Sequence, residues 1–292
     1  MGKKLAVITI SLFVIVTMLG TLAYTQPVNN FTLNSNGWEY REDGLRLNRA
    51  NESGGLPTTF KFNNNFDQMF QDWWWYRSTG DTREYGLSNQ IGFAQPNPTA
   101  VSLVYSEPIN DGATPNALRF NVDYFLTGIS PTLARLDTIW TVTNTSDTTA
   151  SLDFFAYADP DLENNPNNDT GIRDFFNSST GRIRVTDGTS PVFMTFTAGG
   201  GNLVGWEIDE FPDLRQKLTM SGINNLSNTT TPFGPDNVSL AFQWRVASLA
   251  PGQRVSGTFS KEVLIPEASS LLLAIPGLAS LSAWRRRRRQ YT

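Results

Sequence analysis

The sequence predicts an all-β fold, an antiparallel β-sandwich of the immunoglobulin-like or a larger type, lying between two terminal segments of different character. Short aromatic and β-branched runs are separated by clusters of Asn, Gly, Asp, Ser and Thr, as in proteins built of strands and turns. Several runs alternate strictly. Leu118, Phe120, Val122 and Tyr124 are apolar and the residues between them are polar, which suits a half-buried sheet. No long helical periodicity occurs between the terminal segments, so we expect two packed antiparallel sheets.

Nine segments have the composition and spacing of strands. They are residues 45–49, 100–106, 117–126, 135–143, 151–158, 181–186, 192–197, 238–246 and 255–264. We expect two hairpins, one turning at residues 144–149 and the other at residues 249–253, where Pro251-Gly252 suits the middle of a type II turn. The body then covers residues 26–264, and residues 110–116 are the candidate boundary if it divides into two subdomains.

Residues 1–25 have the order of a secretory signal peptide. Lys3 and Lys4 precede an apolar run from Leu5 to Leu22, and small residues follow at the spacing that signal peptidase uses. The run is also long enough to span a bilayer, so an uncleaved anchor is the alternative. The sequence therefore predicts an exported protein.

Residues 265–292 combine three parts. A short motif at residues 265–268 precedes an uncharged segment at residues 268–284, whose length is near the lower limit of roughly 17 residues for a transmembrane helix. A basic cluster follows: Arg285, Arg286, Arg287, Arg288 and Arg289. Basic residues that flank a span stay on the cytoplasmic side, so we expect a C-terminal transmembrane helix with the body outside. The alternatives are a buried element of the fold and a nucleic-acid-binding tail.

This three-part tail resembles the PEP-CTERM sorting signal of exopolysaccharide-producing Gram-negative bacteria, in which a Pro-Glu-Pro motif precedes a transmembrane segment and an arginine-rich cluster. Pro266 and Glu267 match the motif, and Ala268 stands where the second proline is expected. The resemblance covers about residues 265–289. It implies a precursor anchored in the inner membrane, processing by the membrane-embedded transpeptidase called exosortase, and delivery to the cell surface or the extracellular space.

The composition excludes several chemistries. The chain has no cysteine, so no disulfide, thiol nucleophile or thiolate metal site can form. It has no histidine, which removes Ser-His-Asp and Cys-His catalysis and every His-ligated metal site. Between residues 26 and 265 there are 16 basic and 26 acidic residues, a net charge of −10. An acidic exported body argues against nucleic acid as a partner.

The densest polar segment follows a predicted strand and offers an oxygen ligand at every second position. The candidate calcium ligands are Asp159, Asp161, Glu163, Asn165, Asn167 and Asp169. Calcium takes about six to eight oxygen ligands, often from flexible acidic loops. The spacing differs from that of the helix-loop-helix calcium loop, because Asn164 occupies the position that needs glycine. A solvated loop without a metal is the alternative.

A run of aromatic residues is the candidate for sugar stacking: Trp73, Trp74, Trp75 and Tyr76. In a strand, Trp73 and Trp75 would share one face while Trp74 lay on the other. Exposed rings of this kind could stack on the sugar rings of an extracellular polysaccharide. The alternative is that they fill the core, as large aromatic side chains usually do.

The sequence favours a non-enzymatic exported surface or extracellular-matrix protein of an exopolysaccharide-producing bacterium, because no catalytic constellation is assembled. A carbohydrate- or calcium-binding extracellular module is the first alternative. The second is a secreted glycosidase that uses two carboxylates, for which Asp209 with Glu210 and Asp159 with Asp161 are the nearest pairs.

Overall fold

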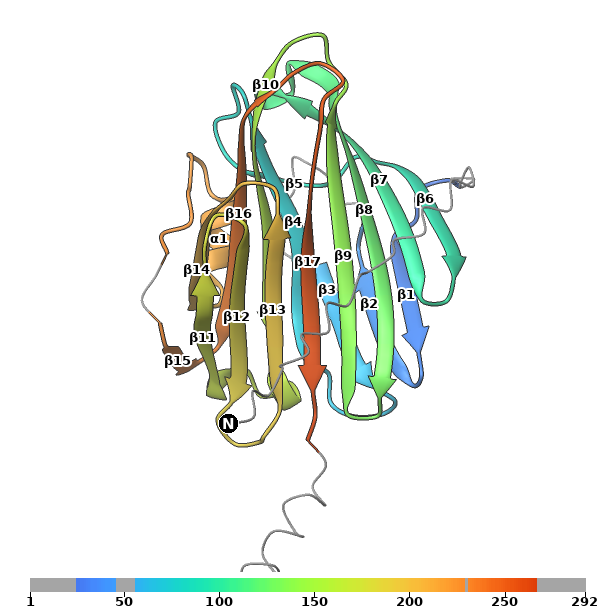
Figure 1. The fold of residues 1–292 in the computed structure, drawn as a ribbon, viewed down its shortest axis with the longest axis vertical. Coiled ribbons are helices and arrows are strands. Elements are labelled where there is room, and N and C mark those ends of the chain that lie inside the picture. Colours follow the sequence, from blue (N-terminus) through green and yellow to red (C-terminus); the bar gives the residue numbers. More distant parts are fainter. Residues whose placement is uncertain (1–24, 46–55, 229–230, 267–292) are drawn as a thin grey trace, which may run out of the picture.

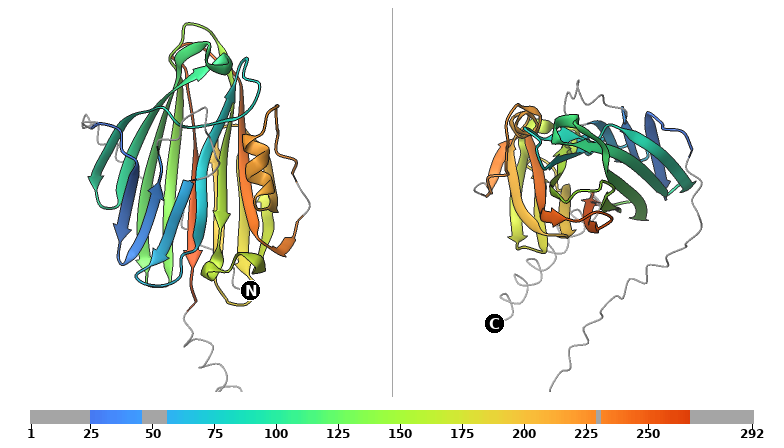
Figure 2. Two further views of the ribbon diagram at one scale, coloured as in Figure 1. Left: turned by 180° about the vertical axis from the view of Figure 1, so that it is seen from behind. Right: turned by 90° about the horizontal axis from the view of Figure 1, so that it is seen from above.

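The computed structural model describes residues 25–45, 56–228 and 231–266. Within them, two antiparallel sheets pack face to face, which confirms the predicted sandwich (Figure 1). One sheet has the order β1-β2-β3-β4-β10-β16-β14, with β5 paired to β4. The other has the order β15-β11-β12-β13-β17-β9-β8-β7-β6. Figure 2 shows the two layers from behind and from above.

The eight-stranded sheet contains β1 (Asn30–Ser35), β2 (Trp38–Asp43), β3 (Leu56–Phe62), β4 (Met69–Ser78), β5 (Tyr85–Gly86), β10 (Ala150–Pro160), β14 (Leu203–Glu210) and β16 (Val238–Leu249). The nine-stranded sheet contains β6 (Gln90–Asn97), β7 (Ala100–Ile109), β8 (Thr114–Ser130), β9 (Leu133–Asn144), β11 (Asp169–Phe176), β12 (Thr180–Asp187), β13 (Phe193–Gly200), β15 (Phe233–Asp236) and β17 (Arg254–Leu264). The described residues also form one short helix, α1 (Asp213–Thr219), and 3₁₀ turns at Asn110–Gly112, Leu162–Asn164 and Pro166–Asn168.

Eight of the nine predicted strands coincide with observed ones, namely β7, β8, β9, β10, β12, β13, β16 and β17. The ninth, residues 45–49, lies almost wholly outside the described residues. The candidate domain boundary at residues 110–116 falls at the connection between β7 and β8, which pair with each other. Each sheet therefore contains strands that precede this connection in the sequence and strands that follow it.

Both predicted hairpins are wrong. β9 pairs with β8 and β17 in the nine-stranded sheet, whereas β10 pairs with β4 and β16 in the eight-stranded sheet. The connections after β9 and after β16 therefore cross between the layers instead of turning back within one. They meet at one end of the sandwich, where the side-chain amide of Asn144 donates to the carbonyl of Leu249 at 2.7 Å. Turn-forming residues serve either kind of connection, so turn chemistry alone does not choose between them.

A true two-residue hairpin joins β1 and β2 at Asn36-Gly37. Both residues have positive φ, +50° and +86°, as a type I′ turn requires. Gly37 has a second constraint, because a Cβ there would lie 2.8 Å from the ring of Phe62. Asn-Gly is a strong hairpin signal, and it predicts this turn although the neighbouring strands are short.

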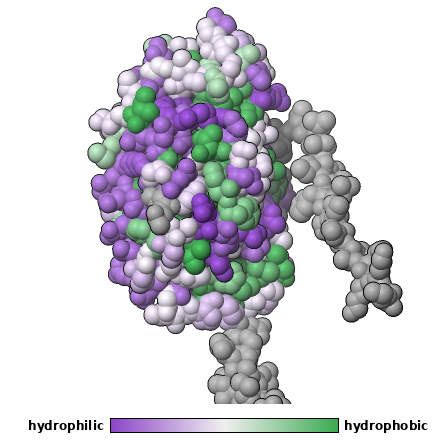
Figure 3. Space-filling view, turned by 60° about the vertical axis from the view of Figure 1, so that its left-hand side comes forward, coloured by the Kyte–Doolittle hydropathy of each residue, from purple (hydrophilic) through white to green (hydrophobic). Residues whose placement is uncertain are grey.

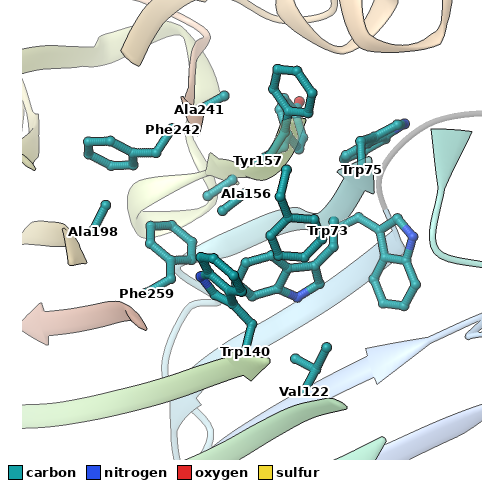
Figure 4. Packing of buried hydrophobic residues seen from close by; sticks show 14 of the residues in the cluster. Trp73, Trp75, Val122, Trp140, Ala156, Tyr157, Ala198, Ala241, Phe242 and Phe259 are labelled. Carbon is teal, nitrogen blue, oxygen red and sulfur yellow. The ribbon is translucent and has the colours of Figure 1, made fainter. Parts of the chain in front are cut away.

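The core between the sheets is rich in aromatic rings. Trp74 stacks on Phe154 with ring centroids 5.3 Å apart, and its indole N–H donates to the hydroxyl of Tyr124 at 2.8 Å. Trp140 and Trp244 join the two layers with an edge contact at 5.2 Å. Figure 4 shows part of this packing. Such pairs add about 0.5–1.5 kcal/mol each beyond the area they bury.

One charged group is enclosed in this core. Lys261 alternates with Phe259 and Val263 along β17, so its side chain points inward, where it pairs with Asp72. The Tyr40 hydroxyl also donates to Asp72, at 2.7 Å. Burial, reinforced by the charge of Asp72, raises the pKa of neighbouring Glu42 to about 8. The interior therefore holds a buried cluster of ionisable groups in which the charge of one group shifts the pKa of its neighbours.

The prediction of a membrane partner is corrected, because no helix in the described residues is long and apolar enough to cross a bilayer. The segment predicted to span it, residues 268–284, lies outside them, as do Glu267, Ala268, the cluster from Arg285 to Arg289 and residues 1–24. Only Pro266 of the sorting motif is described. On the face in Figure 3, apolar residues form separate spots among hydrophilic ones.

Candidate functional site

The outer face of the nine-stranded sheet carries a small polar groove of about 130 Å³ that is open to solvent. Its lining residues come from β12, β13, β17 and β9, four neighbouring strands that lie side by side in Figure 1. Its lining residues are Arg135, Arg182, Thr195, Thr197, Ser260 and Glu262. Each comes from a position that alternates with buried residues along its strand, as the pleat requires.

The strand register arranges these side chains in two rows. In the first row, Thr195 lies opposite Glu262, which lies opposite Arg135. In the second row, Arg182 lies opposite Thr197, and Thr197 lies opposite Ser260. Neighbouring strands are about 4.8 Å apart. Hydroxyl, guanidinium and carboxylate groups are therefore presented together on one surface.

Asp137 completes the second row on β9 and is held by its neighbours. The Arg135 guanidinium donates to one Asp137 oxygen, with Nε at 2.7 Å and Nη2 at 2.6 Å. The Ser260 hydroxyl donates to the same carboxylate at 2.6 Å. These contacts fix the orientation of three side chains along one wall of the groove.

The other two charged groups of the groove are unpartnered. Within the described residues, neither Arg182 nor Glu262 makes an ion pair or a side-chain hydrogen bond. Arg182 only lies over the ring of Phe175, at 5.6 Å. Charged groups without internal partners on a hollowed surface are available to a ligand.

An exposed aromatic ring lies beside the groove. Phe125 on β8 is directly opposite Asp137, and its side chain is 41% exposed. It points to the same face as the two rows because the strands pair without an intervening bulge at this position. The sheet face thus combines polar groups with an apolar platform.

The predicted tryptophan platform is wrong. Trp73, Trp74 and Trp75 are at most 1% exposed, and Tyr76 is fully buried. Trp73 donates its indole N–H to the carbonyl of Leu87 at 3.1 Å, and the Tyr76 hydroxyl donates to the carbonyl of Pro108. These rings fill the interior on both faces of β4 and cannot stack on a sugar.

A polar network closes the outer face of the eight-stranded sheet over these rings. Arg77 pairs with Glu84 and, at 2.5 Å, with Asp153. It also donates to the side-chain oxygen of Asn225 at 2.9 Å. The segment around Asn225 is thereby fixed against β4 and β10, so this face offers no free aromatic surface there.

The six candidate calcium ligands are not brought together as one set, although three of the aspartates lie near one another. Asp159 and Asp169 are buried, whereas Asn167 is exposed. In the described part of the chain, no group of three or more acidic side chains is positioned to hold a metal ion. The Glu163 carboxylate accepts from the side-chain amide of Gln68 at 3.5 Å, and the Glu163 backbone N–H donates to the oxygen of the same amide at 3.1 Å.

The aspartates of this segment form a buried acidic cluster instead. One carboxylate oxygen of Asp159, Asp161, Asp169 and Asp187 has no hydrogen-bond partner among the described residues. Burial, with the Asp67 charge adding to it, raises the pKa of Asp161 to about 6. Burial is also the largest cause that raises the pKa of Asp169 to about 8. The charges of Asp187 and Asp161 add to the rise for Asp169, so these carboxyl groups repel one another.

The two carboxylate pairs proposed for a glycosidase are not assembled. Asp209 and Glu210 are consecutive on β14, so their side chains point to opposite faces. Asp159 is buried beneath the hydroxyl of Tyr157, at 3.4 Å. Neither pair opens onto a shared surface.

Sequence reasoning missed the groove altogether. The alternation of polar residues in β12, β13, β17 and β9 was visible, but it does not say which strands are neighbours. β13 and β17 pair although about sixty residues separate them. The groove residues become a site only through that register.

Comparisons with known proteins place the fold. No protein-family model and no curated protein matches the sequence. Among solved structures, the chain resembles a bacterial glucoamylase complexed with acarbose, with a TM-score of 0.51 and 10% sequence identity over 88% of this chain and 35% of that chain. The chain thus spans about a third of the length of that enzyme, and at this identity the likeness shows the fold alone.

Two further structures align less closely. One is a putative aldose 1-epimerase from Escherichia coli K12, with a TM-score of 0.47, 11% identity, and 84% of this chain and 100% of that chain covered. The other is a GalM/aldose epimerase homologue from C. elegans, with a TM-score of 0.48, 11% identity and the same coverage.

The glucoamylase likeness corrects the predicted function. We expected a non-enzymatic surface or matrix protein, and that expectation rested on the absence of a recognisable site in the sequence. The body instead has a fold that occurs within an enzyme. Neither the structural-protein role nor the absence of activity is therefore retained.

Proposed function

We propose that this chain binds carbohydrate and that the saccharide lies in the groove across β12, β13, β17 and β9. The observation that carries the proposal is the combination of unpartnered Arg182 and Glu262 with hydroxyl groups and the exposed ring of Phe125 on one sheet face. Sugar hydroxyls both donate and accept hydrogen bonds, and the C–H face of a pyranose packs on an aromatic ring. The fold shared with a glucoamylase that was solved with acarbose supports the proposal.

Calorimetric titration of the full chain with a panel of neutral and acidic oligosaccharides tests it. We expect the Glu262→Gln variant to bind roughly tenfold more weakly, because hydrogen bonds to a charged acceptor contribute about 1.5–3 kcal/mol. Thr141→Ala is the matched control, since Thr141 lies on the same face of β9 outside the groove lining. Absence of saccharide binding, or an equal loss in the control, contradicts the proposal.

A second candidate function is glycoside hydrolysis in the same groove. Asp137 and Glu262 occupy diagonal positions on the paired strands β9 and β17. Diagonal positions are about 7–8 Å apart at the strand backbone, so the Glu262 side chain can place its carboxyl group at the separation of roughly 6.5–9.5 Å that an inverting glycosidase needs. Glu262, unpartnered, would protonate the leaving oxygen. Asp137, oriented by Arg135 and Ser260, would take the proton of the attacking water.

Release of reducing ends from bound oligosaccharides tests this activity. We expect Asp137→Asn and Glu262→Gln each to lower the rate by at least a hundredfold, because general acid–base catalysis contributes about 10²–10⁴. Binding without any hydrolysis would leave the groove as a recognition site only.

We also propose that the chain is exported and that residues 265–289 act as a PEP-CTERM-type sorting signal. The support is the order of motif, uncharged segment and arginine cluster in the sequence. Mass spectrometry of the C-terminal peptide of the protein isolated from its native host tests this. A chain that ends near residue 266 is expected, and one intact to Thr292 would contradict processing.

A further inference from the structure

The strand that forms one wall of the groove is cationic. Arg182 and Arg184 are two residues apart on β12, so both point to the outer face of the sheet. Arg184 is engaged, because its Nη2 lies 3.3 Å from Asp174. Arg182 is exposed and meets no carboxylate in the described residues. The free charge of this wall is therefore that of Arg182.

The remaining charges of the groove are arranged in order across the strands. Arg135 on β9 is neutralised by Asp137, with which it forms two close contacts. Glu262 lies between, on β17. An anionic group on the ligand would thus be attracted at the β12 wall and repelled at the centre, which fixes its position and the direction of the ligand.

Two hydroxyl residues lie in the same row as Arg182, on the next two strands of the sheet. Thr197 lies directly opposite Arg182, and Ser260 lies opposite Thr197. Hydroxyls of this kind can hydrogen-bond to the hydroxyls of a sugar ring, while a guanidinium presents a planar fork that matches a carboxylate through two parallel hydrogen bonds. A neutral sugar would leave that fork without its best acceptor.

Resting on the proposed function, we propose that the ligand of this groove is a carboxylated saccharide, a glycan containing hexuronic acid, whose carboxylate binds Arg182. The selectivity is local. The body as a whole is acidic, with a net charge of −10 between residues 26 and 265, so polyanions in general are repelled at long range. Only an anion placed beside Arg182 gains a favourable contact. Because salt screens charges over about 8 Å at physiological ionic strength, the attraction of Arg182 does not extend to anions farther away.

The test compares each acidic oligosaccharide with its own neutral form. Oligomers of galacturonate, mannuronate and glucuronate, each alongside the same oligomer with its carboxyl groups reduced to alcohols, are titrated into the full chain by calorimetry. We expect at least one hexuronate to bind tenfold or more tightly than its reduced form. We expect Arg182→Gln to abolish this preference, so that the acidic oligomer and its reduced form bind with equal affinity.

Two further variants sharpen the assignment. Arg182→Lys keeps the charge and loses the fork, so most of the preference should disappear. Arg119→Gln is the control. It removes an exposed arginine on β8, on the same outer face of the sheet but outside the groove lining, and should leave the preference for the acidic form unchanged.

The outcomes separate this inference from the function on which it rests. Equal binding of the acidic and reduced forms, or a preference that survives Arg182→Gln, would overturn the carboxylate ligand and leave carbohydrate binding intact. No binding of either form would overturn both.

Discussion

Single residues decide how this chain responds to pH. The carboxyl groups of Asp161 and Asp169 have pKa values raised to about 6 and about 8, mainly because they are buried beside other acids. A carboxyl whose folded pKa lies above its unfolded value near 3.8 favours folding while it is protonated. Its contribution is full below about pH 3.8 and is lost as the pH rises through 6 and 8.

We therefore expect Asp169→Asn to reduce the loss of stability between pH 5 and pH 9. The amide keeps the shape and an acceptor for the backbone N–H of Leu162, and it does not titrate. Thermal unfolding at both pH values measures the effect, with Asp174→Asn, at an exposed position on β11, as the control. A variant whose midpoint falls with pH as steeply as that of the parent would show that the cluster is not the source.

The buried pair of Lys261 and Asp72 sets a second expectation at this scale. Lys261→Met leaves the Asp72 charge uncompensated in the core, which should cost about 3–5 kcal/mol of unfolding free energy. Adding Asp72→Asn to it should restore part of the loss, because the charge that remained unpaired is gone. Urea unfolding of the two variants measures both values, and a double variant less stable than Lys261→Met would contradict this explanation.

The connections between strands hold the two layers together at one end. Asn144 is fully buried and donates to the carbonyls of Thr148 and Leu249, both at 2.7 Å. Its own side-chain oxygen accepts from Ser146. One side chain thus satisfies backbone groups of both crossing connections, which join β9 to β10 and β16 to β17.

Asn144→Ala should therefore destabilise the fold by about 1–3 kcal/mol, since the buried carbonyl of Leu249 loses its side-chain donor. Asn177→Ala is a suitable control, because Asn177 makes similar local hydrogen bonds in an exposed turn. Urea unfolding compares them. Equal losses in the two variants would mean that Asn144 acts only within its own turn.

Strands could be predicted from the sequence where the signal lies within the strand itself. Alternation along a strand fixes which side chains share a face, so β8 and β9 could be placed from sequence alone. Pairing is not local. Asn144 to Thr149 has the composition of a hairpin turn, yet its flanking strands belong to different sheets. The tryptophans of β4 were ambiguous for the same reason, because what covers them comes from distant segments such as that around Asn225.

At the scale of the whole molecule, one sheet face is closed and the other is open. Arg77 and its partners fix surface segments over the centre of the eight-stranded sheet. In the described part of the chain, the groove opens to solvent on four adjacent strands of the nine-stranded sheet. No sequence motif marks this groove, since its residues come from four strands brought together by the fold. Ligand recognition on the open face is the central claim that follows.

Amide chemical-shift mapping tests that claim most directly. A ¹⁵N-labelled full chain is titrated with the oligosaccharide of highest affinity in the calorimetric panel, and perturbed amides are assigned to strands. We expect the shifts to concentrate on β12, β13, β17 and β9, with Arg182, Thr197, Ser260 and Glu262 among the largest. Perturbations confined to the eight-stranded sheet, with these four residues unchanged, would contradict it.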